Sequence, residues 1–356
     1  MKLNGNLSMR RWFCLLLIFF LAACGEDKTE VVLAPEKFSG IIERIENNQA
    51  NNLHALVVWQ DNKKLLEVFR EGGGQHGHIQ MSKVPIGRDA LHNVHSVTKS
   101  FVATLIFMAI DEGRLESLDV PVFSLFPEYQ EEDAQDKMAI TVRHILNMST
   151  GYALNEHAMP YGLANPFHRH YSAKDLKAMF LGTPLKFEPG SRFCYSGLST
   201  IGLSKVIERI YEKPFATVMR EKLFEPLGID NYRWINQLGS GEPGADWGLM
   251  TDSESMGKFG LMLLNDGAWE GKQIIQPHWV EKIKVSEFTR GMMGYGMHFW
   301  QLPQFSSAFA ALGHGEQYVI VIPNKNAVIV TTAGNYSQVT QANPVLELAH
   351  QVYQLL

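Results

Sequence analysis

An almost uninterrupted apolar helix constrains the fold of this chain more than any other segment. Residues 96–112 read SVTKSFVATLIFMAIDE, and apolar side chains surround the helix that this segment would form. A helix that is apolar nearly all round is buried. The 356 residues must therefore wrap around it. Because that length exceeds what one core usually serves, we expect two sub-domains, or one large unit with an insertion.

The segments before this helix predict a helix followed by a β-hairpin. Residues 38–49 have helical spacing, and strand-like runs at 53–60 and 64–70 are separated by the turn residues Asp61-Asn62. The glycine-rich segment 72–77 formally matches the dinucleotide-binding pattern GxGxxG. That site needs a helix to open at the glycines, and no helical period follows them. We therefore expect a flexible loop there.

The rest of the chain predicts a mixed α/β (α+β) fold assembled from both ends of the sequence. Residues 91–289 are mainly helical, with breaks at proline and glycine, whereas aromatic and β-branched strands dominate from Tyr295 onward. Residues 341–356 form a closing helix. We expect residues 38–90 and 290–356 to build one α/β part, an antiparallel sheet flanked by N- and C-terminal helices, with the helical region inserted between them.

The N-terminus has the features of a bacterial lipoprotein signal peptide. Three basic residues precede Trp12, and residues 12–23 are an apolar run too short to span a bilayer. The run ends in Leu-Ala-Ala-Cys, which resembles a lipobox with Cys24 as the lipidated residue. The sequence thus predicts a signal peptide at 1–23, a tether at 24–37 and a location in the cell envelope, on the outer membrane and facing the periplasm.

Charge and cysteine content exclude several classes of partner. The net charge is −5, and removal of the signal peptide would take away basic residues only. An acidic chain does not favour nucleic acid, because phosphate binding needs a basic surface. Once Cys14 is removed and Cys24 is lipidated, Cys194 has no partner for a disulfide. No histidine and cysteine set has zinc spacing, so we expect no metal and no cofactor.

Ser96 and Lys99 at the start of the apolar helix are candidates for nucleophilic catalysis. Residues three apart share a helix face, and a helix N-terminus favours developing negative charge. A serine hydroxyl is a weak nucleophile until a neighbour takes its proton, and burial is expected to lower the pKa of the lysine so that it can do so. A chain of this length contains SxxK about once by chance, and a second copy occurs at Ser255 and Lys258.

Two later motifs distinguish Ser96 from Ser255. Tyr195-Ser196-Gly197 follows at a segment that re-enters a helix, and His314-Gly315-Glu316 follows on a predicted strand near the C-terminus. A tyrosine beside a cationic lysine can relay a proton. No GxSxG sequence occurs, which disfavours a Ser–His–Asp triad on an α/β-hydrolase fold.

With these motifs the chain resembles the β-lactamase-related serine hydrolases. This superfamily includes class C β-lactamases, D-alanyl-D-alanine peptidases, esterases and 6-aminohexanoate-dimer hydrolases, and its pattern is SxxK, then Tyr-x-Asn or a variant, then Lys- or His-x-Gly. The resemblance spans roughly residues 38–356. The segments that carry it are 94–129, 141–152, 185–197, 224–229 and 257–280.

The resemblance implies a role for each matching residue. Ser96 would form the acyl-enzyme, Lys99 and Tyr195 would handle the proton, and the backbone N–H groups of Ser96 and Gln317 would form the oxyanion hole. A small-molecule ester or amide would be the substrate. The alternative is a lipid-anchored protein that recognises cell-wall peptides with little or no turnover.

Departures from the family pattern lead to an expectation about the substrate. Gly197 replaces the usual Asn, and Glu316 replaces the usual Gly. Residues two apart on a strand face the same side, so Glu316 would stand beside His314 and repel a substrate carboxylate. Together with His314, only partly charged near neutral pH, this predicts that esters and linear amides react better than penicillins and cephalosporins.

Overall fold

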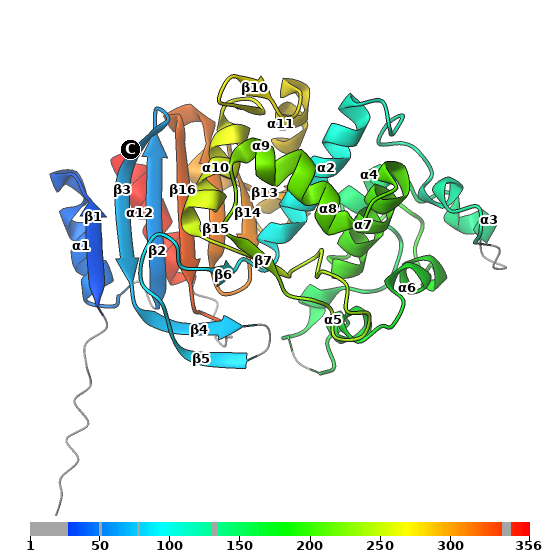
Figure 1. Ribbon diagram of the computed structural model, residues 1–356, viewed down its shortest axis with the longest axis horizontal. Coiled ribbons are helices and arrows are strands. Elements are labelled where there is room, and N and C mark those ends of the chain that lie inside the picture. Colours follow the sequence, from blue (N-terminus) through cyan, green and yellow to red (C-terminus); the bar gives the residue numbers. More distant parts are fainter. Residues whose placement is uncertain (1–27, 50–51, 77–78, 130–133, 162, 337–342) are drawn as a thin grey trace, which may run out of the picture.

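A nine-stranded antiparallel sheet forms one side of the molecule, and a mainly helical region lies beside it (Figure 1). The computed structural model describes residues 28–49, 52–76, 79–129, 134–161, 163–336 and 343–356. The predicted signal peptide and Cys24 lie outside the described residues. Within the described part of the chain, no helix combines the length and hydropathy that a membrane crossing needs.

The sheet is built from both ends of the chain, as the sequence predicts. Strands from the N-terminal part pair with strands from the C-terminal part through β2 and β16. This confirms the predicted fold class. In spatial order the strands are β1 (Thr29–Leu33), β3 (Lys63–Arg70), β2 (Leu53–Gln60), β16 (Ala327–Ala333), β15 (Gln317–Ile322), β14 (Ala308–Gly313), β13 (Phe299–Leu302), β12 (Met293–Gly296) and β11 (Phe288–Arg290).

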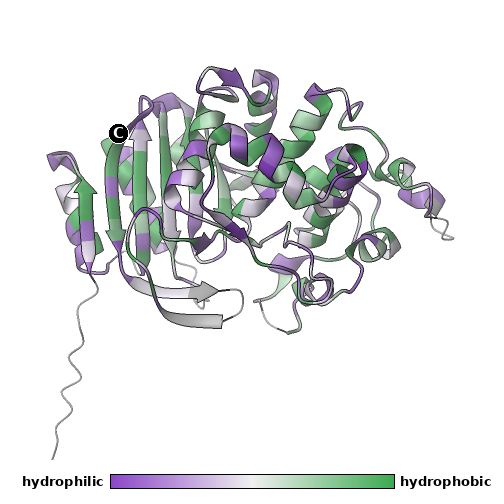
Figure 2. Cartoon of the chain, viewed as in Figure 1, coloured by the Kyte–Doolittle hydropathy of each residue, from purple (hydrophilic) through white to green (hydrophobic). Residues whose placement is uncertain are grey.

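Both faces of the sheet are covered by helices, so its central strands are hydrophobic on both sides. In β16, Val328 and Val330 join one core cluster, while Ile329 joins the other. The first cluster lies under α2 (Val97–Asp111) and α10 (Ser253–Leu264), and the second under the terminal helices α1 (Ser39–Glu46) and α12 (Pro344–Leu355). Figure 2 shows the long hydrophobic stretches in these strands.

The inserted region surrounds α2, in which every residue from Val97 to Ala109 is buried. A short sheet of β6 (His92–Asn93), β8 (Leu249–Thr251) and β7 (Tyr232–Trp234) lies at the junction with the large sheet. The other helices are α3 (Ala134–Lys137), α4 (Val142–Leu146), α5 (Phe167–Tyr171), α6 (Leu176–Gly182), α7 (Gly197–Tyr211), α8 (Phe215–Met219), α9 (Glu225–Leu227) and α11 (Pro277–Ile283), and β9 (Ala268–Trp269) pairs with β10 (Lys272–Gln273).

The predicted tether at 24–37 is wrong for its C-terminal half. Thr29–Leu33 forms β1, which pairs with β3 at the edge of the sheet, and Glu36–Phe38 forms a short 3₁₀ helix. The segment contains Val31 and Val32, whose branched side chains suit a strand. The strand satisfies backbone groups that would otherwise be left unpaired along the outer edge of β3.

The glycine-rich segment is a hairpin rather than the predicted loop. β4 (Gly72–His76) pairs with β5 (Ile79–Val84) and projects below the large sheet (Figure 1). A Cβ atom at Gly72 would collide with the Asn52 side chain and would lie 2.8 Å from the His54 ring. At Gly72, therefore, glycine permits close packing of the strand against its neighbours.

Candidate active site

Ser96 is held at the N-terminus of α2 by a tight turn. The preceding residue, His95, has a positive φ of 45°, and its backbone N–H donates to the Asn93 side chain over 3.0 Å. Ser96 is the N-cap residue of the helix, but its side chain makes no capping hydrogen bond. The Ser96 hydroxyl therefore remains directed to other partners.

Lys99 lies one turn further along the same helix and is the immediate partner of Ser96. Its Nζ donates to Ser96 Oγ over 3.2 Å and to the backbone carbonyl oxygen of Asp246 over 2.6 Å. The Lys99 side chain is 2% exposed, and its Nζ lies 5.3 Å from the centroid of the Tyr195 ring. Two segments far apart in sequence thus fix the ammonium beside the serine.

The expectation that burial leaves Lys99 with a lowered pKa is wrong. Burial is the largest influence and does lower the pKa, but interactions with Tyr195, Asp246 and Glu156 together raise it above its ordinary value. The apolar sequence of α2 contains no sign of these carboxylates, because they come from residues 156 and 246. At neutral pH the resting site therefore holds Lys99 as an ammonium.

Tyr195 is the third residue of the candidate catalytic group. Its ring is 2% exposed and stacks on His157 with a centroid separation of 4.0 Å. Burial raises the pKa of Tyr195, although the Lys99 charge and a hydrogen bond with Ser96 act in the opposite direction. The phenol is therefore neutral at rest. Ser96, Lys99 and Tyr195, chosen from the sequence, lie together in space.

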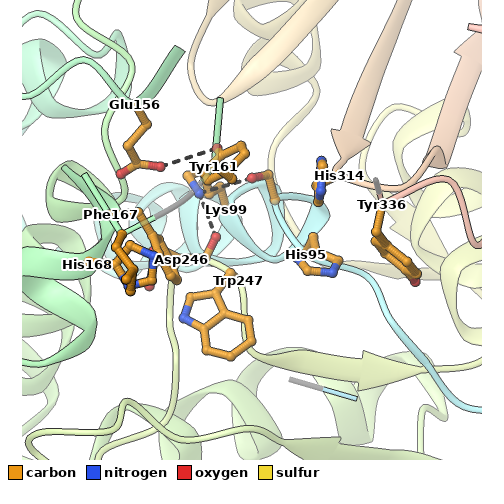
Figure 3. Close-up of a pocket in the computed structure, with 12 residues that line it drawn as sticks. His95, Lys99, Glu156, Tyr161, Phe167, His168, Asp246, Trp247, His314 and Tyr336 are labelled. Atoms are coloured by element: carbon orange, nitrogen blue, oxygen red, sulfur yellow. Dashed lines mark hydrogen bonds between the residues drawn. The ribbon is translucent and has the colours of Figure 1, made fainter. Parts of the chain in front are cut away.

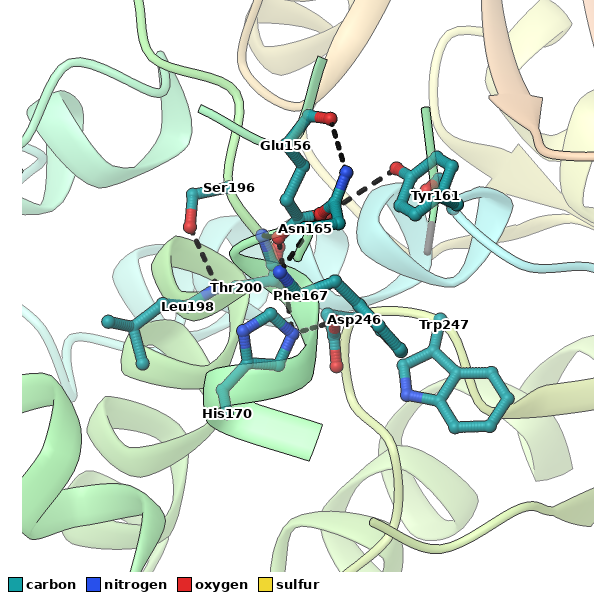
Figure 4. A network of polar contacts seen from close by, with 12 residues as sticks. Glu156, Tyr161, Asn165, Phe167, His170, Ser196, Leu198, Thr200, Asp246 and Trp247 are labelled. Carbon is teal, nitrogen blue, oxygen red and sulfur yellow. Dashed lines mark hydrogen bonds and ion pairs between the residues drawn. The ribbon is translucent and has the colours of Figure 1, made fainter. Parts of the chain in front are cut away.

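Gly197, which stands where the family usually has Asn and is a sequence-based candidate to contact the substrate, packs against buried groups of the protein. Its backbone N–H donates to Glu156 Oε1 over 2.5 Å, so it is already occupied inside the protein. A Cβ atom at Gly197 would collide with Asp246 Oδ2 and lie 2.9 Å from His170 Nε2. The volume beside Gly197 is thus filled by a buried Asp246–His170 pair, whose side chains are hydrogen-bonded over 3.1 Å (Figure 4).

The third motif lies in the turn between β14 and β15 rather than on a strand. His314 lines the site, and because burial lowers its pKa it is a neutral imidazole near pH 7. Gly315 has a φ of 80°, and a Cβ atom there would collide with the Tyr336 ring. Glycine is therefore required at this position by both backbone conformation and packing.

The predicted place of Glu316 on a strand beside His314 is wrong. With a φ of 69° it breaks the strand geometry that would place it beside His314. Its carboxylate accepts hydrogen bonds from the Asn335 side chain and, over 3.1 Å, from the backbone N–H of Val345. Although Glu316 lines the second cavity described below, this carboxylate is committed to internal partners.

Gln317 is fully buried at the start of β15. Its side chain donates to the carbonyl oxygens of Gly315 and Ala333. These side-chain contacts do not involve its backbone N–H, whose place in an oxyanion hole stays a prediction. The turn residues that do reach a cavity wall are 313–316.

Two cavities meet at Ser96. The first, of about 310 Å³, is shown in Figure 3, and the second is about 260 Å³. The second is more polar and includes Arg290, Asn335 and Asn343 in its wall. The wall of the first is formed by His95, Ser96, Lys99, Glu156, Tyr161, Leu163, Phe167, His168, Asp246, Trp247, His314 and Tyr336.

Five aromatic rings surround the first cavity in a closed circle, here called the aromatic collar. Tyr161 contacts Phe167, Phe167 contacts Trp247, and Trp247 contacts His95, with ring centroids 6.1, 5.8 and 6.2 Å apart. His95 contacts His314 at 5.5 Å, and His314 returns to Tyr161 at 5.2 Å. The collar presents a mostly apolar wall next to the Ser96 hydroxyl.

The second SxxK copy is not an active site. Ser255 is buried within α10, where its backbone N–H donates to the capping Asp252 side chain. Lys258 donates to the carbonyl oxygen of Gly228. Neither residue lines either cavity at Ser96.

Sequence reasoning missed the acidic side of the site. Glu156, His170 and Asp246 are buried close together (Figure 4), and the Asp246 backbone carbonyl accepts from Lys99, but no spacing in the sequence links the three residues. A charged residue predicted to be buried is the one signal that could have identified them. No group of three or more histidine, cysteine, aspartate or glutamate side chains in the described ranges is arranged to hold a metal ion.

The comparisons with known proteins agree with this fold. The beta-lactamase family model matches residues 46–351, so the chain belongs to the beta-lactamase family. Beta-lactamase-like protein 4 of Dictyostelium discoideum is 23% identical over 224 residues, which are 60% of this chain and 37% of that protein. The chain therefore spans little more than a third of that relative's length.

Two further matches are to proteins that are named for different activities. The 6-aminohexanoate-dimer hydrolase of Paenarthrobacter ureafaciens is 22% identical over 274 residues, covering 74% of this chain and 63% of the enzyme. The crystal structure of a family VIII carboxylesterase superposes with a TM-score of 0.70 at 16% identity, covering 92% of this chain and all of that one. At this identity, the second match shows the fold alone.

Proposed function

We propose that this protein is a serine hydrolase that cleaves an ester or amide bond of a small molecule through an acyl-enzyme on Ser96. The observation that carries the proposal is the 3.2 Å contact between Lys99 Nζ and Ser96 Oγ at the junction of two cavities. A nucleophile beside a group that can exchange its proton, with open space on both sides, is what acyl transfer requires.

The reactive form in this proposal is the Lys99–Tyr195 pair after it has lost one proton. Because an ammonium and a phenolate attract each other, the remaining proton is shared by Lys99 and Tyr195 and is not assigned to either residue alone. As Ser96 Oγ bonds to the substrate carbonyl carbon, its proton passes to the pair. The same proton then goes to the leaving alcohol or amine as the C–O or C–N bond breaks. Water releases the acyl group by the reverse proton route.

The negative oxygen of the tetrahedral intermediate needs hydrogen-bond donors. Ser96 stands at the N-terminus of the 15-residue helix α2, where the helix dipole favours negative charge. The turn at 313–316 forms the facing wall of the second cavity. The Ser96 N–H and this turn are therefore our candidates for the oxyanion site.

The aromatic collar supports an uncharged or planar group on one side of the scissile bond. Apolar and aromatic surfaces favour groups of the same kind, and His314 carries no charge at neutral pH to attract an anion. Esters and linear amides with such a group are the proposed substrate class. The 6-aminohexanoate-dimer hydrolase to which the chain is similar is named as a hydrolase, which is consistent with this reaction class.

Lipidation of Cys24 and anchoring in the outer membrane, facing the periplasm, remain part of the proposal. They rest on the basic, apolar and Leu-Ala-Ala-Cys segments of the sequence alone. Fractionation of cells that express the full chain and its Cys24→Ser variant tests them. We expect the first in membranes and the second without lipid, whereas soluble wild-type protein in the periplasm would contradict the anchor.

A panel of p-nitrophenyl esters, linear anilides and a chromogenic cephalosporin tests the activity. We expect turnover of at least one ester or anilide, lost in Ser96→Ala and retained in Ser255→Ala. If a chain that is folded by circular dichroism turns over none of them, and retains cell-wall peptides on a column, the alternative of binding without turnover is correct.

A further inference from the structure

We propose that His170 is a positioning residue whose positive charge, balanced between the carboxylates of Asp246 and Glu156, keeps Lys99 able to release its proton. The inference rests on the proposed function, in which Lys99 and Tyr195 exchange a proton with Ser96. It assigns a task to three buried residues, Glu156, His170 and Asp246, which lie close together (Figure 4).

His170 is enclosed by acidic groups from two other segments. It belongs to α5 and is 1% exposed, and its Nε2 lies 3.1 Å from Asp246 Oδ2 and 4.0 Å from Glu156 Oε1. Asp246 and Glu156 are 0% and 2% exposed. A carboxylate at such depth needs a cation or several hydrogen bonds to remain ionised. Burial raises the pKa of Glu156, and the charges of His170 and Lys99 act in the opposite direction.

Asp246 connects this pair to the lysine. Its backbone carbonyl oxygen accepts from Lys99 Nζ, while its side chain accepts from His170 and from Gln237 Nε2, the latter over 2.8 Å. The Asp246 charge contributes to the raised pKa of Lys99, and His170 contributes to the lowered pKa of Asp246. Asp246 thus connects His170 to the Lys99 ammonium beside Ser96.

The effect of His170 on Lys99 depends on the balance of buried positive and negative charges around the lysine. Two carboxylates and the Lys99 ammonium alone would leave one buried negative charge that holds the lysine proton tightly. An imidazolium at His170 makes two cations and two anions, and so weakens the hold on that proton. The other titratable groups that face this cluster are Tyr195 and Tyr161. His157 and His298 also face Lys99. Burial, with a further contribution from the Lys99 charge, lowers the pKa of each to about 3, so both stay neutral.

The glycine at position 197 makes room for the buried Asp246–His170 pair. The Asp246–His170 pair occupies the space into which a side chain at position 197 would project. The glycine there also brings its backbone N–H to Glu156. Gly197 therefore does two things, because it admits the pair and supplies a neutral donor to the second carboxylate.

Direct titration of Lys99 tests the proposal without a substrate. The full chain is labelled with ¹³Cε-lysine, and the Lys99 signal is identified by its loss in Lys99→Arg. We expect His170→Gln, which keeps an N–H donor for Asp246 but not the charge, to raise the Lys99 titration midpoint by on the order of one pH unit. Asp246→Asn, which keeps the backbone carbonyl, should lower the midpoint by a similar amount.

Opposite shifts separate an electrostatic task from simple damage to the fold. The exposed histidine variant His278→Gln, on α11, should leave the Lys99 midpoint unchanged. The proposal is overturned if His170→Gln leaves the midpoint where it is or lowers it, or if both variants move it in one direction. If Asp246→Asn fails to fold, Glu156→Gln replaces it and should lower the midpoint. If His170→Gln fails to fold, His170→Asn replaces it and should raise the midpoint.

The same samples distinguish this proposal from the proposed function. Labelling of Ser96 by a fluorophosphonate probe reports on the nucleophile alone. Opposite shifts without any labelling would contradict the hydrolase and leave the charge relationship intact. Labelling without the shifts would contradict the role of His170 only.

Discussion

The carboxylate of Glu316 accepts a hydrogen bond from the backbone N–H of Val345, 3.1 Å away, and so joins the turn that carries His314 to the first turn of α12. Its second oxygen accepts from the Asn335 side chain. Burial raises the pKa of Glu316, which these hydrogen bonds only partly offset. Glu316 is thus a structural residue of the turn.

We therefore expect Glu316→Gln to lower the free energy of unfolding by about 1–3 kcal/mol, because an amide would set an N–H donor against one of the two donors. The ratio of cephalosporin to ester turnover should stay within about twofold of the wild type. Urea unfolding and the substrate panel measure the two effects, with exposed Glu116→Gln as the control. A large gain in cephalosporin turnover would revive the idea that Glu316 repels the substrate.

Gly197 supplies a second prediction. A methyl group there would collide with Asp246 Oδ2, so Gly197→Ala should cost about 1–3 kcal/mol of stability. It should also reduce kcat by displacing the carbonyl that holds Lys99. Gly40→Ala, in α1, is the matched control, since a Cβ atom there meets nothing within 4 Å, and it should stabilise the protein by roughly 0.5–1 kcal/mol. Wild-type activity in Gly197→Ala would contradict the packing described here.

Stability in mild acid depends on a buried histidine pair. His54 Nδ1 and His92 Nε2 are 3.2 Å apart, so one must donate and the other accept. Burial lowers the pKa of His54 to about 3 and that of His92 to about 4. In the unfolded chain both titrate near 6.5. The unfolded state therefore binds more protons than the folded state below about pH 6.5, and stability falls as the pH falls through that window.

From pH 7 to pH 5 this effect amounts to on the order of 2 kcal/mol for each histidine. Urea unfolding at both pH values should show that the variant with His54→Gln and His92→Gln loses less stability on acidification than the wild type. His278→Gln should behave like the wild type. Equal losses in the wild type and the double variant would show that the pair does not titrate as described.

The raised pKa values of Lys99 and Tyr195 determine the expected pH–rate profile. Both groups hold their protons at neutral pH, so the fraction of the reactive form increases as the pH rises. We expect kcat/KM to increase about tenfold per pH unit from pH 7 to pH 9, after subtraction of the Ser96→Ala background. Lys99→Arg should lose nearly all activity, because arginine does not deprotonate in proteins. A plateau already reached at pH 7 would mean that the pKa of the pair is lowered.

The sequence could predict those features that are local or that follow the hydrophobic pattern. The apolar helix after Ser96 and the aromatic and β-branched runs of the C-terminal strands are sufficient for the α/β arrangement, and SxxK with Tyr195 is sufficient to identify the candidate nucleophile and the residues beside it. Features that depend on distant contacts could not be predicted. β1 forms because β3 offers an unpaired edge, and the direction of the Lys99 pKa depends on Asp246, which lies 147 positions away.

Glu316 shows the same limit within a single motif. An acidic residue two positions after His314 would lie on the same side as His314 in a strand, but in a turn its side chain can point elsewhere. The choice depends on Asn335 and Val345, which accommodate its carboxylate only after the chain has folded.

The most direct test of the account is to identify which serine reacts. The full chain, its Ser96→Ala variant and its Ser255→Ala variant are treated with a fluorophosphonate probe, and the modified peptide is located by mass spectrometry. We predict a single adduct on the peptide containing Ser96 in the wild type and in Ser255→Ala, and no adduct in Ser96→Ala. An adduct on Ser255, or equal labelling of all three proteins, would contradict the assignment of Ser96 as the nucleophile.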